Sequence, residues 1–86
     1  MTEEMITEQV LTILRQRLHQ EELQLTPETR FQEDLEVDSI AFMEIIIAME
    51  DHFQLAISDE DAEHLSTLSD VVAYLKRRLD NSGIGW

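Results

Sequence analysis

Glycine and proline are almost absent from this chain, and this scarcity limits what the chain can fold into. Its 86 residues include one proline, Pro27, and two glycines, both among the last four residues. Because these residue types are the strongest local breakers of regular structure, long helices can form without interruption. Apolar residues recur at helical spacing, and strand-like alternation is weak. We therefore expect an all-α fold, a small four-helix bundle with three longer helices and one short helix.

The apolar periodicity sets the expected helix bounds. In the first helix, one stripe of apolar side chains recurs at i, i+4, i+7, i+8 and i+12 from Ile6. Helical segments are predicted over residues 3–20, 39–53, 59–65 and 68–79. Short polar side chains that precede these segments can accept the free N–H groups of the first turns. The predicted N-caps are Thr2, Asp38, Ser58 and Thr67.

A long connection joins the first two predicted helices, over residues 21–37. A loop of this length in a compact domain needs a functional or packing reason. Its apolar residues indicate that it packs against the core: Leu23, Leu25, Phe31 and Leu35. We expect one domain over residues 1–80 and a flexible C-terminal tail over residues 81–86, where helix-stopping residues begin.

The second predicted helix is apolar around much of its circumference, which indicates contacts on two sides. One stripe should enter the core: Phe42, Ile45, Ile46, Met49 and Phe53. The opposite face mixes aliphatic side chains with carboxylates and is the predicted partner-binding surface: Ile40, Met43, Glu44, Ile47 and Asp51. The alternative is that Met43 and Ile47 pack under the long connection.

Ser39 lies where the loop meets this helix. A serine at such a junction has an accessible hydroxyl at the positive end of the helix dipole, a favourable place for a phosphodiester. If Ser39 carries one, the chain holds a substrate for other enzymes and performs no chemistry itself.

The acidic residues are concentrated around this serine. The formal net charge is −13, and no Lys or Arg occurs between Phe31 and Leu75, a span that contains twelve Asp and Glu residues. Such a surface repels nucleic acid and anionic membranes and attracts basic patches of proteins. The alternative is that the acids serve only solubility.

The remaining composition excludes several classes. There is no cysteine, so neither a disulfide framework nor a thiolate metal site is expected. The acidic N-terminus argues against a secretory signal, and no apolar run approaches the length of a membrane span. We expect a cytoplasmic monomer that binds no metal, nucleic acid or membrane.

These features together resemble an acyl carrier protein, over roughly residues 5–79. The matching residues are Glu33-Asp34-Leu35, Asp38-Ser39-Ile40, Glu44-Ile45, Met49-Glu50-Asp51, Phe53, Ile57, Asp59 to Ala62, Thr67 and Val71 to Leu75. The resemblance implies that a phosphopantetheinyl transferase attaches the 4'-phosphopantetheine of coenzyme A to Ser39. The terminal thiol of this arm would then carry an acyl group as a thioester, which fits a chain without its own cysteine.

The same resemblance implies roles for other residues. Asp38 would cap the helix and contact the transferase or its metal ion. An acyl chain could enter a pocket between the helices, lined by Phe42, Ile45, Met49, Ile57, Ala62, Leu65 and Val71. The expected partners, besides the transferase, are acyl-loading, ketosynthase or acyltransferase enzymes with basic docking patches.

The chain departs from the fatty-acid version of the family pattern at the start of the second helix. Ala41 and Phe42 replace an acid and a small polar residue, Ile40 replaces Leu, and Ser58 replaces a common Pro. These changes favour a discrete carrier of a specialised polyketide or fatty-acyl pathway. A housekeeping fatty-acid carrier and a free-standing peptidyl or aminoacyl carrier are the alternatives.

Other functional classes fit less well. Catalysis by Ser39 would need a nucleophile elbow, and the sequence around Ser39 does not form one. His52 lies near the opposite end of the same predicted helix, too far away to act as its base. A calcium loop starting at Asp59 would need Gly at its sixth and Glu at its twelfth position, where His64 and Asp70 stand. An acidic helical interaction module without a cofactor remains a rival interpretation.

Overall fold

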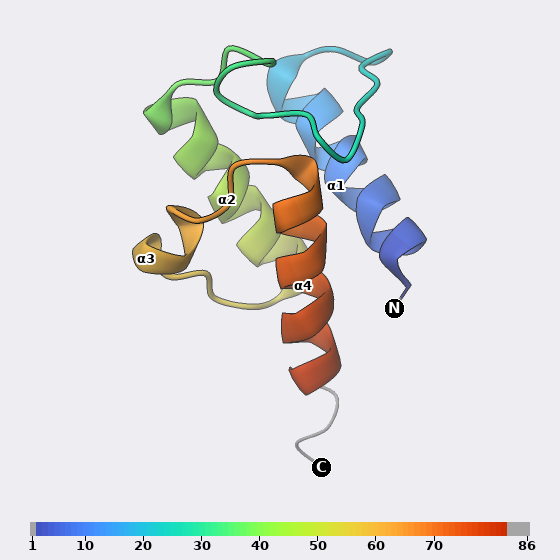
Figure 1. Ribbon diagram of the computed structural model, residues 1–86, viewed down its shortest axis with the longest axis vertical. Helices are drawn as coiled ribbons and strands as arrows, with labels where there is room; N and C mark the ends of the chain where they lie inside the picture. Colours follow the sequence, from blue (N-terminus) through green and yellow to red (C-terminus); the bar gives the residue numbers. More distant parts are fainter. Residues whose placement is uncertain (1, 83–86) are drawn as a thin grey trace.

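The structure is a computed structural model that describes residues 2–82. It contains four helices and confirms the all-α prediction (Figure 1). They are α1 (Glu3–Leu18), α2 (Ser39–Phe53), α3 (Asp59–Ala62) and α4 (Leu68–Ser82). Within residues 2–82, no helix is long and apolar enough to cross a membrane.

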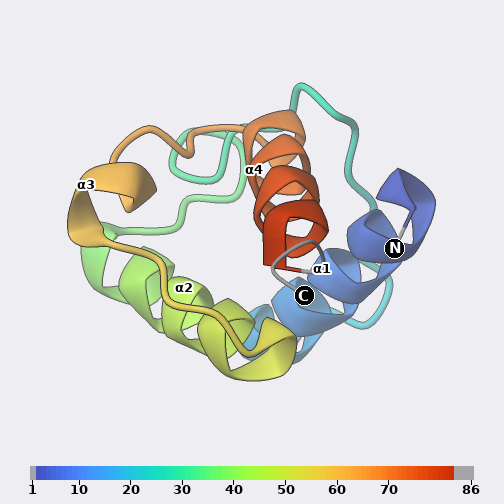
Figure 2. The same cartoon turned by 90° about the horizontal axis from the view of Figure 1, so that it is seen from below.

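The three long helices share one apolar interior. α1 packs against both α2 and α4, and α3 stands apart at the edge of the molecule (Figure 2). The core stripe predicted for α2 is buried throughout. The most deeply buried side chains come from all three long helices and from the long connection: Ile6, Val10, Leu14, Phe31, Ile45, Ile46, Met49, Val71 and Leu75.

The predicted caps of the first three helices are present. The Thr2 hydroxyl accepts the N–H of Met5 at 3.2 Å. The Ser58 hydroxyl accepts the N–H of Asp61 at 3.1 Å, and the Asp38 cap is described with the site below. Each bond satisfies a donor that a helix start leaves unpaired.

The start of α4 is capped reciprocally. The Thr67 hydroxyl accepts the N–H of Asp70 at 3.1 Å. The Asp70 carboxylate in turn accepts the N–H groups of Thr67 at 3.2 Å and Ser66 at 3.1 Å. This is the capping-box arrangement with Asp in place of the usual Glu, and it fixes the segment that leads into α4.

Three predicted helix ends are displaced. α1 ends at Leu18 instead of residue 20, because His19 turns into the left-handed region at φ 56°. α3 ends at Ala62 instead of residue 65, since the N–H groups of His64 and Leu65 bond three residues back and bring Leu65 into the core.

α4 continues to Ser82 instead of ending at residue 79. An ion pair of 2.9 Å between Lys76 and Asp80, one turn apart, supports this last stretch. The predicted tail therefore begins inside a helix, and residues 83–86 lie outside the described part of the chain.

The long connection packs against the body of the protein, as its apolar residues predict. Phe31 is fully buried, and Leu23, Leu25 and Leu35 pack partly against the core. The Arg15 guanidinium on α1 donates two hydrogen bonds, of 2.9 and 2.8 Å, to the Leu23 carbonyl. The connection is thus fixed to α1 at one end.

A short antiparallel bridge fixes the connection to the start of α4. Arg30 pairs with Thr67. The N–H of Phe31 bonds the Ser66 carbonyl at 3.1 Å, and the N–H of Leu68 bonds the Thr29 carbonyl at 3.0 Å. This contact between distant segments places residues 30–33 opposite the start of α2.

Candidate functional site

Ser39 is the first residue of α2, and its side chain is exposed to solvent. The preceding Asp38 has an extended backbone, with φ −80° and ψ 178°, and its carboxylate accepts the N–H of Ala41 at 2.7 Å. The helix dipole therefore directs its positive end towards the Ser39 hydroxyl, and one carboxylate stands beside it. This places a free hydroxyl where a phosphodiester is favoured.

The backbone before Ser39 is held in an unusual shape. Glu36 adopts φ 54°, the left-handed region that a residue with a side chain seldom occupies. The next residue, Val37, is buried, and its N–H donates to the Phe31 carbonyl at 3.1 Å. The sharp turn at Glu36 and the anchoring of Val37 bring Asp38 and Ser39 to the surface.

The predicted partner-binding face of α2 is exposed. Ile40 is 74% exposed and Ile47 is 57% exposed, and Met43 is also exposed. Glu44 and Asp51 lie on this helix with exposed side chains. The alternative that both Met43 and Ile47 pack under the long connection is wrong for Ile47, whereas Met43 is 38% exposed and lines a cavity shared with that connection.

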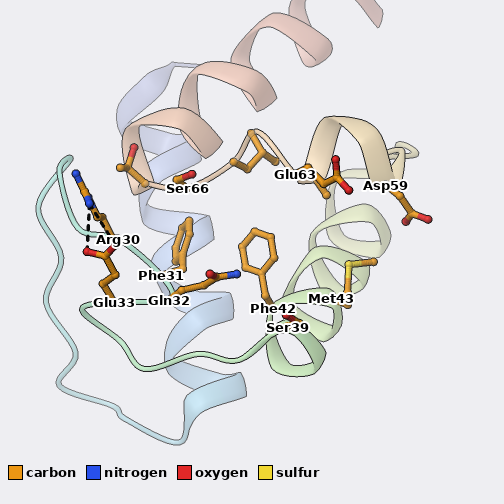
Figure 3. A pocket seen from close by; sticks show the side chains of 13 residues that line it. Arg30, Phe31, Gln32, Glu33, Ser39, Phe42, Met43, Asp59, Glu63 and Ser66 are labelled. Carbon is orange, nitrogen blue, oxygen red and sulfur yellow. Dashed lines mark hydrogen bonds and ion pairs between the residues drawn. The ribbon is translucent and has the colours of Figure 1, made fainter.

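A cavity of about 880 Å³ opens beside Ser39. Its apolar floor includes the Phe31 and Phe42 rings, whose centroids lie 5.6 Å apart at an angle of 39° (Figure 3). The rim is mostly polar and includes the exposed ion pair between Arg30 and Glu33, at 3.1 Å. The cavity is lined by Arg30, Phe31, Gln32, Glu33, Ser39, Phe42, Met43, Asp59, Ala62, Glu63, Leu65, Ser66 and Thr67.

The residues predicted to line an acyl pocket divide into two groups. Phe42, Ala62 and Leu65 line the cavity beside Ser39. The other four are buried in the core and do not line it: Ile45, Met49, Ile57 and Val71. The sequence predicts one pocket lined by all seven residues, whereas in the structure three of them line an open cavity and four lie buried in the core.

Sequence reasoning missed the side of the cavity formed by the long connection. The sequence identifies Phe31 only as a packing residue and gives no reason to place Gln32, Ser66 or Thr67 in a site. The bridge between Arg30 and Thr67 brings these residues to the cavity, and such a long-range pairing leaves no local pattern in the sequence.

The α3 side of the cavity is positioned by contacts with its neighbours. The Glu50 carboxylate of α2 accepts the N–H of Ile57 at 2.7 Å, just before α3 begins. The Tyr74 hydroxyl of α4 donates to the Asp61 carboxylate at 2.8 Å. Burial, followed by this hydrogen bond, raises the pKa of Tyr74 despite the opposing effect of Arg78.

His52 shares α2 with Ser39 but does not line the cavity beside it. His52 lies in the last turn of α2 and contacts the Gln9 side chain of α1 at 2.6 Å. Among residues 2–82, no histidine lines the cavity beside Ser39. No group of three or more His, Cys, Asp or Glu side chains within that described range could hold a metal ion.

Known proteins share both the sequence pattern and the fold. The family described as "Phosphopantetheine attachment site" matches residues 8–75. The solved structure of a Mycobacterium tuberculosis protein described as an acyl carrier protein superposes with a TM-score of 0.78 at 26% identity. The match covers 84% of this chain and 96% of that protein. Family membership replaces the interpretation as an interaction module without a cofactor: the chain belongs to the acyl carrier protein family, whose members carry phosphopantetheine and are not themselves enzymes.

Proposed function

We propose that Ser39 is the attachment point of the 4'-phosphopantetheine arm. The observation that carries this proposal is the position of its exposed hydroxyl at the start of α2, beside an open cavity. The Ser39 Oγ would form a bond to the β-phosphorus of coenzyme A as the pyrophosphate bond breaks and 3',5'-ADP leaves. A base of the transferase would take the Oγ proton, since the Asp38 carboxylate beside Ser39 is engaged with the N–H of Ala41.

The residues around Ser39 suit a tethered group. The N-terminus of α2 favours the phosphodiester, and the adjacent cavity leaves room for the arm to fold back. When bound, the arm supplies a terminal thiol that holds an acyl group as a thioester. Asp38 holds the start of α2 in place and is also the residue we assign to contact with the transferase.

We further infer that partner enzymes dock on the exposed face of α2, formed by Ile40, Met43, Glu44, Ile47 and Asp51. Exposed aliphatic side chains of this kind bind a complementary surface, while carboxylates steer a basic patch towards it. The partners in question are the transferase and acyl-loading, ketosynthase or acyltransferase enzymes. The net charge of −13 opposes self-association, which supports a monomeric carrier. We assign its place of action to the cytoplasm.

The pathway that fits best is a specialised polyketide or fatty-acyl one. Ala41 and Phe42 give α2 an apolar and aromatic start, with Phe42 in the cavity, which favours a restricted set of partners. A housekeeping fatty-acid carrier and a free-standing peptidyl or aminoacyl carrier are the competing assignments. Efficient malonyl loading by a housekeeping fatty-acid acyltransferase would favour the first of them, and loading by an adenylating enzyme would favour the second.

The attachment site is tested by intact mass. The protein is incubated with coenzyme A and a broad-specificity phosphopantetheinyl transferase, in parallel with Ser39→Ala and Ser66→Ala. Ser66 is a matched control, because it is another exposed serine that lines the same cavity. We expect a single adduct on the wild type and on Ser66→Ala, and none on Ser39→Ala. The helical circular dichroism of Ser39→Ala should be unchanged, and an adduct on that variant would disprove the assignment.

A further inference from the structure

Phe42 separates the cavity beside Ser39 from the interior of the protein. It follows Ser39 by three positions, so that the two residues lie on neighbouring parts of the same helix face. Its ring is 8% exposed and packs against Phe31, which is fully buried (Figure 3). The two rings therefore form a closed floor between the tether point and the core.

The interior beyond this floor is closed to solvent. Ile45 and Met49 continue the stripe of Phe42 along α2 and are 1% and 0% exposed, and Val71 of α4 is fully buried. Because protein cores are close-packed, an added chain can enter there only if side chains move. An acyl group attached through Ser39 thus meets the cavity first and the Phe42 ring next.

The cavity itself offers a mixed surface. Its floor is aromatic, and its rim carries the side chains of Arg30, Gln32 and Glu33 together with the hydroxyls of Ser66 and Thr67. In Figure 3 the Gln32 amide points towards the Phe42 ring. Within residues 2–82, Gln32 makes no hydrogen bond to another side chain or to the backbone, so its amide is free to bind a ligand. Such a surface matches a compact group with polar atoms better than a long saturated chain.

We propose that Phe42 is a specificity-determining residue, which confines the carried acyl group to the cavity beside Ser39 and selects a compact acyl group with a polar substituent. This inference rests on the proposed attachment at Ser39. A group tethered there is present at an effective concentration in roughly the millimolar range, so that weak contacts with Phe31, Phe42 and Gln32 are enough to hold it.

The test compares the thermal stability of loaded forms. The transferase attaches butyryl-, 3-hydroxybutyryl- or octanoyl-phosphopantetheine to Ser39 from the corresponding acyl-coenzyme A, and intact mass verifies each product. A group that contacts only the folded state raises Tm, whereas a solvent-exposed group does not. For the wild type we expect the octanoyl form to melt within about 1 °C of the butyryl form, and the 3-hydroxybutyryl form to melt above both.

Two variants of one residue type make the test specific. Phe42→Ala should open a path into the core, so that its octanoyl form melts at least about 4 °C above its butyryl form. Phe53→Ala is the matched control, because Phe53 is equally buried at 8% but lies at the other end of α2. Phe53→Ala should lose a comparable amount of stability, but its octanoyl form should not melt above its butyryl form. Phe42→Leu serves in the same comparison if Phe42→Ala does not fold.

Several results would overturn the proposal. An octanoyl form of the wild type that melts well above the butyryl form would show that Phe42 does not close the core. Phe42 would have no gating role if the octanoyl form melted no higher than the butyryl form in both Phe42 variants. An equal rise in Tm for the octanoyl form of Phe53→Ala would lead to the same conclusion. The hydroxyl preference should disappear in Gln32→Leu, and its persistence would contradict the assigned contact. A missing adduct in the mass spectrum would instead disprove the attachment at Ser39, so the two failures are distinguishable.

Discussion

The hydroxyl of Tyr74 on α4 donates a hydrogen bond of 2.8 Å to the carboxylate of Asp61 on α3. α3 spans only four residues, too few for a helix to be stable by itself. The Tyr74 ring is buried, and the guanidinium groups of Arg77 and Arg78 lie 5.8 and 5.5 Å from its centroid. This contact with α4 therefore helps to hold the short helix that borders the cavity, together with the bond between Glu50 and Ile57.

Tyr74→Phe should destabilise the protein by about 1 kcal/mol at neutral pH, because the ring stays buried while the hydroxyl's hydrogen bonds with Asp61 and Arg78 are lost. Urea unfolding measures this free energy. Asp61→Ala removes the bond with Asp61 from the other side, and in the double variant the two losses should not add. Additive losses would show that the two groups do not interact.

The raised pKa of Tyr74 predicts a loss of stability at alkaline pH. The folded state keeps the phenol protonated above its ordinary pKa of about 10, so the stabilisation is complete below that pH and is lost as pH rises through the folded pKa. The unfolding free energies of wild type and Tyr74→Phe should converge at alkaline pH. Tyr74 is the only tyrosine, so the ultraviolet absorbance of tyrosinate reports its titration directly. A midpoint at or below the ordinary value would contradict this prediction.

Two substitutions of Asp38 separate its two proposed roles. Asp38→Ala should destabilise the protein by about 1 kcal/mol, since the Ala41 N–H loses its acceptor, whereas Asp38→Asn should stay within about 0.5 kcal/mol of the wild type. If the charge also contacts the transferase or its metal ion, Asp38→Asn lowers kcat/KM for arm attachment without this loss of stability. Ser58→Ala, which removes the α3 cap, is the control. An unchanged kcat/KM in Asp38→Asn would restrict Asp38 to capping.

Charge reversal on the exposed face of α2 should weaken the encounter with the transferase. We expect Glu44→Lys and Asp51→Lys each to lower kcat/KM for arm attachment by up to about tenfold at low salt, while attachment remains measurable. The difference from wild type should shrink as salt screens the charges. Glu8→Lys on α1 makes the same charge change at an exposed position and is the control. An equal effect of Glu8→Lys, or an effect independent of salt, would contradict local steering.

The helices could be predicted from the sequence because their signals are local. The apolar stripe of α2 and the caps at Thr2, Asp38, Ser58 and Thr67 each depend on residues within one or two turns of one another. The positions of the helix ends are harder to predict. His19 ends α1 by entering the left-handed region, although glycine is the residue usually found at such a position.

The side of the cavity formed by the long connection could not be predicted, because it depends on pairing between distant segments. The bridge between residues 30 and 67 holds the segment in which Phe31 packs against Phe42, and no periodicity in either segment encodes that bridge. The exposed position of Ser39 at the start of α2 could be predicted from the helix signals around it. The division between side chains that line the cavity and those that lie in the core behind Phe42 could not, because it depends on how all side chains pack together.

Glu36→Gly should stabilise the protein. Glu36 holds φ 54° in the turn that leads to Ser39, where a Cβ atom crowds the backbone and glycine does not. We expect a gain of about 0.5–1 kcal/mol in the free energy of unfolding, after allowance for the greater freedom of glycine in the unfolded chain. Glu36→Ala removes the same charge but keeps the Cβ atom, so it should show no comparable gain. Urea unfolding of both variants measures the difference. Equal stabilisation by both would assign the effect to relief of acidic repulsion around Ser39, and destabilisation by Glu36→Gly would show that the Glu36 side chain itself supports the turn.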